Sequence, residues 1–191
     1  FIKKKKNIKN FHIFNPYFRI RDFDKILIPY HDINLKYPNI IRFDGSIVNE
    51  ENKKISKSEQ NYFKKQIVLD NKKENICILI GGSGKSSSFS QNDIKNFINY
   101  LLKINRKYYS LFFLFSRRTP LKLKKYIKQS FGKFSYIWNE KQKNPYWFLL
   151  NNCNFFIVTS DSISMTSEAI STNKPVFVFE IEKIKEKILR F

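Results

Sequence analysis

The stretch from Ile76 to Phe89, ICILIGGSGKSSSF, contains the residue types of a phosphate-binding loop. Its apolar run stops at Gly81, and glycine and serine residues follow directly. A buried strand that enters a glycine-rich turn and then a helix offers an anion backbone N–H groups and the positive end of a helix dipole. The stretch predicts either such an anion site or a plain strand-to-helix turn with flexible serines. The candidate anion-binding residues are Gly81, Gly82, Ser83 and Lys85.

The spacing of this stretch disfavours an ATPase. The Walker pattern needs a first glycine, four free positions and then Gly-Lys-Ser or Gly-Lys-Thr. Gly84-Lys85-Ser86 supplies the end of the pattern, but Leu79 occupies the position of the first glycine. The loop is therefore too short to wrap a triphosphate in the P-loop manner, and no second acidic strand end for a magnesium ion is evident.

Polar residues follow other predicted strands in the same way. Arg117 and Arg118 come directly after one strand, and a guanidinium fork matches phosphate oxygens bidentately. The alternative for both arginines is plain surface charge. In open α/β sheets, ligands bind beyond the carboxyl ends of the strands. The repeated polar strand ends therefore favour a binding site at one edge of the sheet.

The stretch SDSISMTSEA, residues 160–169, follows another predicted strand. The hydroxyls of Ser162 and Ser164 crowd a predicted helix start, where such groups cap free N–H groups. Glu168 either completes a capping box or accepts hydrogen bonds from both hydroxyls of a ribose. Asp161 either caps the helix or orients a ligand.

His31 and Asp32 end a predicted strand in the string IPYHD. A histidine beside a carboxylate can serve as a general base near neutral pH. A surface turn is the alternative. A Ser/His/Asp triad cannot be argued, because the only other histidine, His12, lies inside a predicted strand.

Short apolar runs alternate with segments of helical period, which predicts βαβ units and an α/β fold with parallel sheets. The expected strands are 11–14, 25–29, 40–43, 76–80, 111–115, 134–137, 155–159 and 176–179. The expected helices are 56–68, 92–105, 121–131, 145–151, 164–171 and 184–189.

The first 50 residues leave little room for helices between their strands, whereas the βαβ rhythm is regular from Ile76. We therefore expect three parts. Residues 1–50 would be the C-terminal part of an incomplete N-terminal domain, 51–75 a linker with one helix, and 76–191 a second, doubly wound domain. The chain starts at Phe1 rather than Met, so we expect a fragment of a longer protein.

The net charge of +20 comes from a chain with 36 Lys and Arg residues but one alanine, Ala169. This skew fits a genome-wide base bias, so the charge does not predict nucleic-acid binding. The run Lys3–Lys6 is the best candidate for contact with an anionic membrane surface. Cys77 and Cys153 lack metal-ligand spacing, and we expect both to be buried thiols. No metal site and no cofactor are expected.

Six strings, in this order and spacing, resemble the mitochondrial-fission "elongated mitochondria" family. They are IPYHD, NIIRFDGSI, LIGGSGKSSSF, SRRTP, NPY and TSDSISMTSEAISTNKPVFVF, and they cover nearly all of the chain. SRRTP and DSISMTSEA are specific, whereas GGSG alone is not. Bacterial members of this family are described as nucleoside-diphosphate-sugar epimerases, and plant members act in mitochondrial division.

The family in turn resembles GT-B glycosyltransferases, in which two Rossmann-like domains clasp a nucleotide-sugar. This resemblance implies that Gly81, Gly82 and Ser83 form a diphosphate loop. It also places Ser167 and Glu168 on the donor-binding helix, with Glu168 as the ribose ligand. Asn173 departs from the glycine of the related TGKP turn. Asparagine tolerates left-handed geometry, so the turn can persist.

The resemblance thus implies a GT-B-like glycosyltransferase that uses a nucleotide-diphosphate sugar, with a UDP-sugar favoured, in envelope glycan synthesis. The arginines and the glycine loop would neutralise the diphosphate, and His31 or Asp32 would serve as acid or base. An epimerase on the same scaffold and a non-catalytic adaptor are the alternatives. The acceptor is not predicted. The expected location is cytoplasmic, with contact at the inner face of the plasma membrane as a further expectation.

Overall fold

The structure is a computed structural model that describes residues 8–84 and 87–191. The chain divides into two compact units. One unit comprises the residues as far as Ser46 together with Lys185–Phe191, and the other comprises Ile47–Ile184. The sequence predicts instead that the first domain ends at residue 50 and that the C-terminal segment belongs to the second domain. Lys85 and the run Lys3–Lys6 lie outside the described residues.

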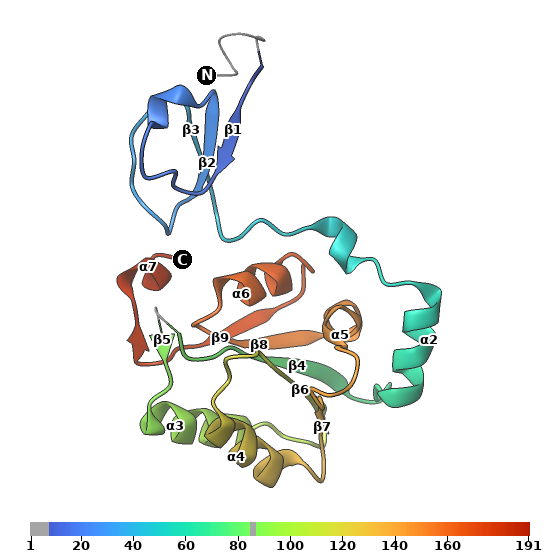
Figure 1. Cartoon of the computed structure of the whole chain (residues 1–191). Helices are drawn as coiled ribbons and strands as arrows, with labels where there is room; N and C mark the ends of the chain where they lie inside the picture. The colour runs from blue at the N-terminus through green and yellow to red at the C-terminus, as the bar shows by residue number, and fades with distance from the viewer. Residues whose placement is uncertain (1–7, 85–86) are drawn as a thin grey trace. The chain divides into compact units, whose positions relative to one another are not determined.

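The larger unit is built on five parallel strands in the order β7-β6-β4-β8-β9 (Figure 1). Their bounds are β4 Glu74–Ile80, β6 Tyr109–Phe115, β7 Tyr136–Ile137, β8 Phe155–Thr159 and β9 Val176–Phe179. Numbered in chain order, these strands lie as 3-2-1-4-5, which is the Rossmann order. The predicted α/β class with parallel sheets is therefore confirmed.

Helices cover both faces of this sheet. Their bounds are α2 Lys57–Gln66, α3 Gln91–Leu102, α4 Leu121–Phe131, α5 Tyr146–Asn152 and α6 Ile163–Ile170. Helices α3 and α4 pack on one face, and α2, α5 and α6 pack on the other (Figure 1). The central strand β4 is therefore buried on both faces, which explains its continuous apolar sequence.

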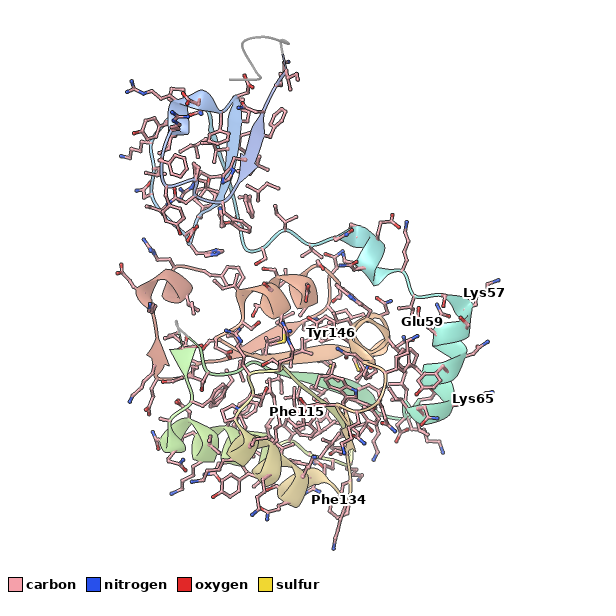
Figure 2. All side chains as sticks on the ribbon, in the orientation of Figure 1. Lys57, Glu59, Lys65, Phe115, Phe134 and Tyr146 are labelled. Atoms are coloured by element: carbon pink, nitrogen blue, oxygen red, sulfur yellow. The ribbon has the colours of Figure 1, made fainter. Side chains whose placement is uncertain are left out.

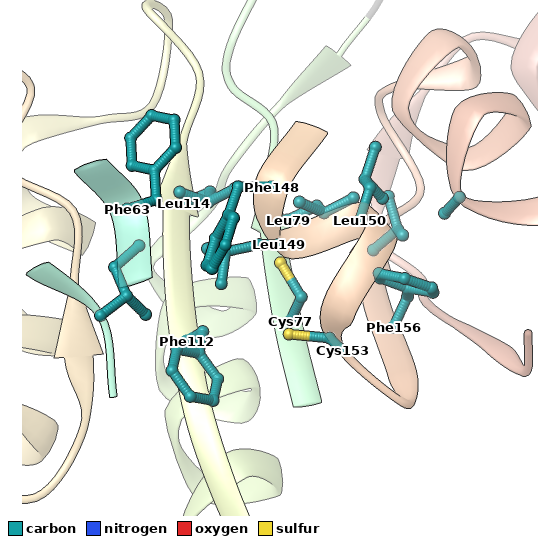
Figure 3. Close-up of a cluster of buried hydrophobic side chains, with 13 residues drawn as sticks. Phe63, Cys77, Leu79, Phe112, Leu114, Phe148, Leu149, Leu150, Cys153 and Phe156 are labelled. Atoms are coloured by element: carbon teal, nitrogen blue, oxygen red, sulfur yellow. The ribbon is translucent and has the colours of Figure 1, made fainter. Parts of the chain in front are cut away.

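The side chains of β4 alternate between two apolar clusters. Ile76, Ile78 and Ile80 face α3 and α4. Cys77 faces α5 and packs in the other cluster with Cys153, which follows that helix (Figure 3). Both cysteines are buried free thiols, as the sequence predicted, and burial raises the pKa of the Cys77 thiol well above its usual value.

The smaller unit contains a three-stranded parallel sheet in the order β1-β2-β3. Its elements are β1 Phe11–Ile13, the 3-10 helix η1 Ile20–Asp22, β2 Lys25–Pro29, β3 Ile40–Phe43 and the short helix α7 Glu186–Leu189. The chain end after α7 returns to the end of β2. There the ring of Phe191 packs edge-on to the ring of His31, with 5.7 Å between centroids.

Three short elements of the larger unit were not expected from the sequence. They are the 3-10 helix η2 Glu50–Lys53 and an antiparallel pair made by β5 Ser87–Ser88 and β10 Lys183–Ile184. The residues of η2 and β5 are all polar and β10 has one apolar residue, so none of the three has the apolar run or the helical period by which the other elements are recognised. Within residues 8–84 and 87–191, no helix is long and apolar enough to cross a membrane.

The turn after α6 places Asn173 in the left-handed region, with φ of 58°. Its N–H donates to the carbonyl oxygen of Ile170 at 3.0 Å, so asparagine does maintain this turn. We expect Asn173→Ala to lower the free energy of unfolding by about 1 kcal/mol, because a Cβ without a compensating polar group is strained at positive φ. Asn173→Gly should be neutral or stabilising. Urea denaturation measures both, and equal stability of the two variants would contradict this account.

Candidate functional site

The loops after β4 and β8 meet where the strand order reverses. Strand β4 lies between β6 and β8, and the chain first adds β6 and β7 on one side before it adds β8 and β9 on the other. In open α/β sheets, ligands bind beyond the carboxyl ends of the strands at such a switch point. Here the two loops begin with Gly81 and Ser160.

The first two N–H groups of the glycine loop point into the protein. The Gly81 N–H donates to Oγ1 of Thr159 at 2.8 Å, and the Gly82 N–H donates to Oδ2 of Asp161 at 2.6 Å. The Thr159 hydroxyl in turn donates to Oδ1 of Asp161 at 2.6 Å. Side chains from β8 and its loop therefore use these two donors, and the glycines contribute close packing rather than open N–H groups.

This packing explains why the sequence has glycine at both positions. A Cβ at Gly81 would lie 2.0 Å from Oδ2 of Asp161, and one at Gly82 would lie 2.1 Å from the carbonyl group of Arg118. Neither contact can be relieved by a rotamer change, because the first involves a hydrogen-bonded carboxylate and the second involves backbone. The loops after β4, β6 and β8 are thus packed directly on one another.

Thr119 links the loop after β6 to the end of β4 through hydrogen bonds. Its hydroxyl contacts the carbonyl oxygens of Ile80 at 2.9 Å and Gly81 at 2.5 Å, and its side chain is buried. The preceding arginines, Arg117 and Arg118, are exposed. A Cβ on Gly84 would lie 2.6 Å from Nη1 of Arg118, so this guanidinium lies beside the glycine loop.

Asp161 is the acidic centre of the site. Burial raises the pKa of its carboxyl above the usual 3.8, although the hydrogen bonds from Thr159 and Gly82 and the charge of Arg118 act in the opposite direction. Arg118 is therefore near enough to act on the charge of Asp161. The sequence suggests two roles for Asp161, ligand orientation and helix capping. The structure adds a third role, because this carboxylate holds the glycine loop in place through its hydrogen bond to Gly82.

Helix α6 starts immediately after Asp161. Ser162 is its N-cap, since its Oγ accepts a hydrogen bond from the Met165 N–H at 3.4 Å. Ser164 is exposed in the first turn, and Ser167 is buried in the second. The positive end of the α6 dipole is thus at the same sheet edge as the Arg118 loop.

At the start of helix α3, by contrast, the free N–H groups and the positive end of the dipole already have a partner within the protein. Asp93 and Ser90 form a reciprocal capping box, with N–O distances of 2.7 and 3.0 Å. The second carboxylate oxygen of Asp93 accepts from the N–H of Glu182 at 2.9 Å. A negative side chain therefore already occupies the end of α3 that the glycine loop was expected to present to an anion.

Glu168 does not cap α6. Its Oε2 accepts a hydrogen bond from the Tyr146 hydroxyl at 2.5 Å, and Tyr146 begins helix α5 (Figure 2). Burial, followed by the contact with Glu168, raises the pKa of the Tyr146 phenol far above its usual value of 10. The NPY string gives no sign of this role for Tyr146, because a partner 22 residues away along the chain leaves no local signal.

The structure therefore brings together part of the predicted set. Gly81 and Gly82 are in direct contact with Asp161, and Arg118 packs against Gly82. The remaining predicted residues of this part follow along α6 and are Ser162, Ser164, Ser167 and Glu168. Ser83 accepts a hydrogen bond through its Oγ from the Phe89 N–H at 3.3 Å, within its own loop. In the described part of the chain, no three His, Cys, Asp or Glu side chains gather to hold a metal ion.

His31 and Asp32 belong to the smaller unit. His31 is buried against Phe191, and the backbone oxygen of Asp32 accepts a hydrogen bond from Nη2 of Arg190 at 3.3 Å. Both residues lie in the turn after β2, and the acid–base role proposed for them from sequence stays a prediction.

Comparison with known proteins places the chain in a family. All 191 residues match the family described as Mitochondrial fission ELM1. The uncharacterized protein RP120 of Rickettsia prowazekii (strain Madrid E) is 30% identical over 228 residues, which cover 98% of this chain and 63% of that protein. The mitochondrial fission protein ELM1 of Arabidopsis thaliana is 33% identical over 118 residues, which cover 61% of this chain and 28% of that protein. The chain thus spans less than two thirds of the length of either curated relative. It belongs to the mitochondrial fission ELM1 family.

Proposed function

We propose that the larger unit binds a nucleotide-diphosphate sugar and serves as the donor-binding half of a GT-B-like glycosyltransferase. The observation that carries this proposal is the junction of three loops at the switch point, where Asp161 braces the glycine loop and Arg118 lies beside it. A site of this kind is preorganised, because its loops are packed and hydrogen-bonded without a ligand.

The diphosphate would lie at the start of α6, next to the exposed arginines. The guanidinium groups of Arg117 and Arg118 would pair with its oxygens, and the α6 dipole would favour its negative charge. During transfer, negative charge develops on the nucleotide diphosphate that leaves the sugar. The exposed guanidinium groups of Arg117 and Arg118, together with the positive end of the α6 dipole, would neutralise this charge and so lower the barrier.

The ribose would lie farther along the same helix, at Glu168. Glu168 lies five positions after Ile163 in α6, and a rise of about 1.5 Å per residue places them about 7.5 Å apart along the axis. This separation is comparable to the span between the diphosphate and the ribose hydroxyls of one nucleotide. Glu168 is half-buried, so its carboxylate remains partly open to a ligand.

Loss of the Glu168 carboxylate should weaken nucleotide binding. We expect Glu168→Ala to reduce the affinity of the full-length protein for UDP by about 10-fold or more, since a hydrogen bond to a charged group contributes about 1.5–3 kcal/mol. Isothermal titration calorimetry measures this change. Glu51→Ala, which removes an exposed carboxylate from η2, is the control and should leave the affinity unchanged.

Equal UDP affinity of the Glu168→Ala variant and the unsubstituted protein would remove Glu168 from the site. Product analysis with a UDP-sugar then separates the chemical alternatives. Transfer of the sugar to an added acceptor supports a glycosyltransferase, whereas isomerisation of the sugar without any acceptor supports an epimerase.

A non-catalytic adaptor is the second candidate, and one structural observation favours it. The Gly81 and Gly82 N–H groups are used by Thr159 and Asp161, so the loop is complete without a nucleotide. The name of the Arabidopsis relative also refers to mitochondrial fission rather than to catalysis. Absence of binding to UDP, ADP, GDP and CDP, together with retention of a defined protein partner, would favour the adaptor.

A further inference from the structure

The two oxygens of the Glu168 carboxylate have different surroundings. The Tyr146 hydroxyl donates to Oε2 at 2.5 Å, and within the described residues Oε1 receives no hydrogen bond. A carboxylate oxygen accepts hydrogen bonds and cannot donate them when ionised. One oxygen of Glu168 is therefore anchored, and the other remains able to accept a hydroxyl.

Tyr146 is itself held firmly at the start of α5. Its backbone N–H donates to Oδ1 of Asn144 at 3.0 Å, and its ring packs edge-on to Trp147 with 5.3 Å between centroids. The phenol is a donor throughout the neutral range, and burial, together with the hydrogen bond to Glu168, raises its pKa further above the usual value of 10. The anchor of Glu168 is thus a fixed side chain rather than a mobile surface group.

The far end of α5 is fixed as well. Nζ of Lys174 contacts the carbonyl oxygens of Asn151 at 2.8 Å and Cys153 at 2.6 Å, where the helix ends. A cation at a helix C-terminus satisfies carbonyl groups that have no partner within the helix and interacts favourably with the dipole. Helix α5 therefore presents Tyr146 to α6 at a defined position.

We propose that Tyr146 is a positioning residue that holds Glu168 as a selector for ribose hydroxyls, so that the site takes ribonucleotides in preference to their deoxy analogues. This inference rests on the proposed function. The phenol restricts rotation of the carboxylate and leaves Oε1 directed to the ligand. A site built to hydrogen-bond a hydroxyl discriminates against an analogue that lacks it, because the polar group of the site is then left unpaired.

The ratio of affinities for ribose and deoxyribose ligands is the decisive quantity. The full-length protein is titrated with UDP, 2′-deoxy-UDP and 3′-deoxy-UDP by calorimetry. We expect a preference for UDP over at least one analogue of roughly 10- to 100-fold, as a hydrogen bond to a charged group implies. Tyr146→Phe should reduce this preference by roughly 10-fold. A purely structural defect would instead weaken all three ligands together and leave the ratio unchanged.

Two controls accompany the measurement. Tyr136→Phe removes the hydroxyl of another half-buried tyrosine in the same apolar cluster, and it should retain the full preference. In the Glu168→Gln background, Tyr146→Phe should cause little further change in the ratio, because the two residues act as a unit. The thermal unfolding midpoint of each variant verifies that it is folded.

The outcomes separate this inference from the function on which it rests. An unchanged UDP preference in Tyr146→Phe would overturn the role of Tyr146 while leaving nucleotide binding intact. Equal binding of UDP and both deoxy analogues by the unsubstituted protein would also overturn it. Failure of the unsubstituted protein to bind UDP, ADP, GDP or CDP would overturn the proposed function, and this inference with it.

Discussion

Gly82→Ala is expected to lower the free energy of unfolding by about 3 kcal/mol, at the upper end of the range for overpacking. The added Cβ would lie 2.1 Å from both the carbonyl carbon and the carbonyl oxygen of Arg118 and 2.5 Å from the backbone nitrogen of Thr119. All three are backbone atoms, and Thr119 fastens that backbone to the end of β4. The substitution therefore has to push one loop away from another rather than rotate a side chain.

Gly84→Ala is the matched control for this prediction. Its Cβ would lie 2.6 Å from Nη1 of Arg118, which is the end of a flexible and exposed side chain. We expect a change within about 0.5 kcal/mol, as is usual at surface positions. Chemical denaturation followed by circular dichroism measures both variants. Similar stabilities for Gly82→Ala and Gly84→Ala would show that the loops are not packed as described.

Asp161→Ala is expected to have an effect of similar size for a different reason. The substitution leaves the buried Gly82 N–H without an acceptor and removes the partner of the Thr159 hydroxyl. An unsatisfied buried polar group costs about 1–3 kcal/mol, so we expect a loss of about 3 kcal/mol for the two groups together. Asp161→Asn retains one acceptor oxygen, which can serve only one of these two donors, so it should lose less than Asp161→Ala, about 1–2 kcal/mol.

Comparison of the unsubstituted protein with the Asp161→Asn variant also tests how stability depends on pH, and the direction of the expected change is known. The pKa of Asp161 is raised above 3.8 in the folded state, so between the ordinary and the raised pKa the folded protein binds more protons than the unfolded chain. The contribution of the Asp161 carboxyl to the free energy of unfolding is fully present below its ordinary pKa. This contribution is lost as the pH rises through the raised pKa of the folded state. Relative to Asp161→Asn, the unsubstituted protein should therefore lose stability as the pH rises from about 4. Urea denaturation across this range would contradict the account if the relative stability rose instead.

Much of the fold could be predicted because the larger unit follows simple periodicities. Strands β8 and β9 and helix α4 have the bounds expected from sequence, and β4 and β6 each begin two residues earlier than expected. Continuous apolar runs separated by amphipathic segments leave few alternatives to a parallel sheet covered by helices. The start of β7 was placed at Phe134, which is in fact exposed in the turn before the strand.

The site was harder to predict because its contacts join residues that are far apart in the chain. A glycine-rich loop indicates close packing or anion binding, and only the contact between Gly82 and Asp161, 79 residues away, shows where its N–H groups point. The partnership of Tyr146 and Glu168 depends in the same way on the packing of α5 against α6. Nor does any local signal indicate that α7 and the residues after it join the smaller unit.

A crystal structure of the full-length protein with bound UDP is the most direct test of the proposed site. The account predicts the diphosphate between the Arg118 guanidinium and the start of α6, with a ribose hydroxyl within hydrogen-bonding distance of Oε1 of Glu168. A nucleotide bound elsewhere, or one whose ribose faces away from α6, would contradict it.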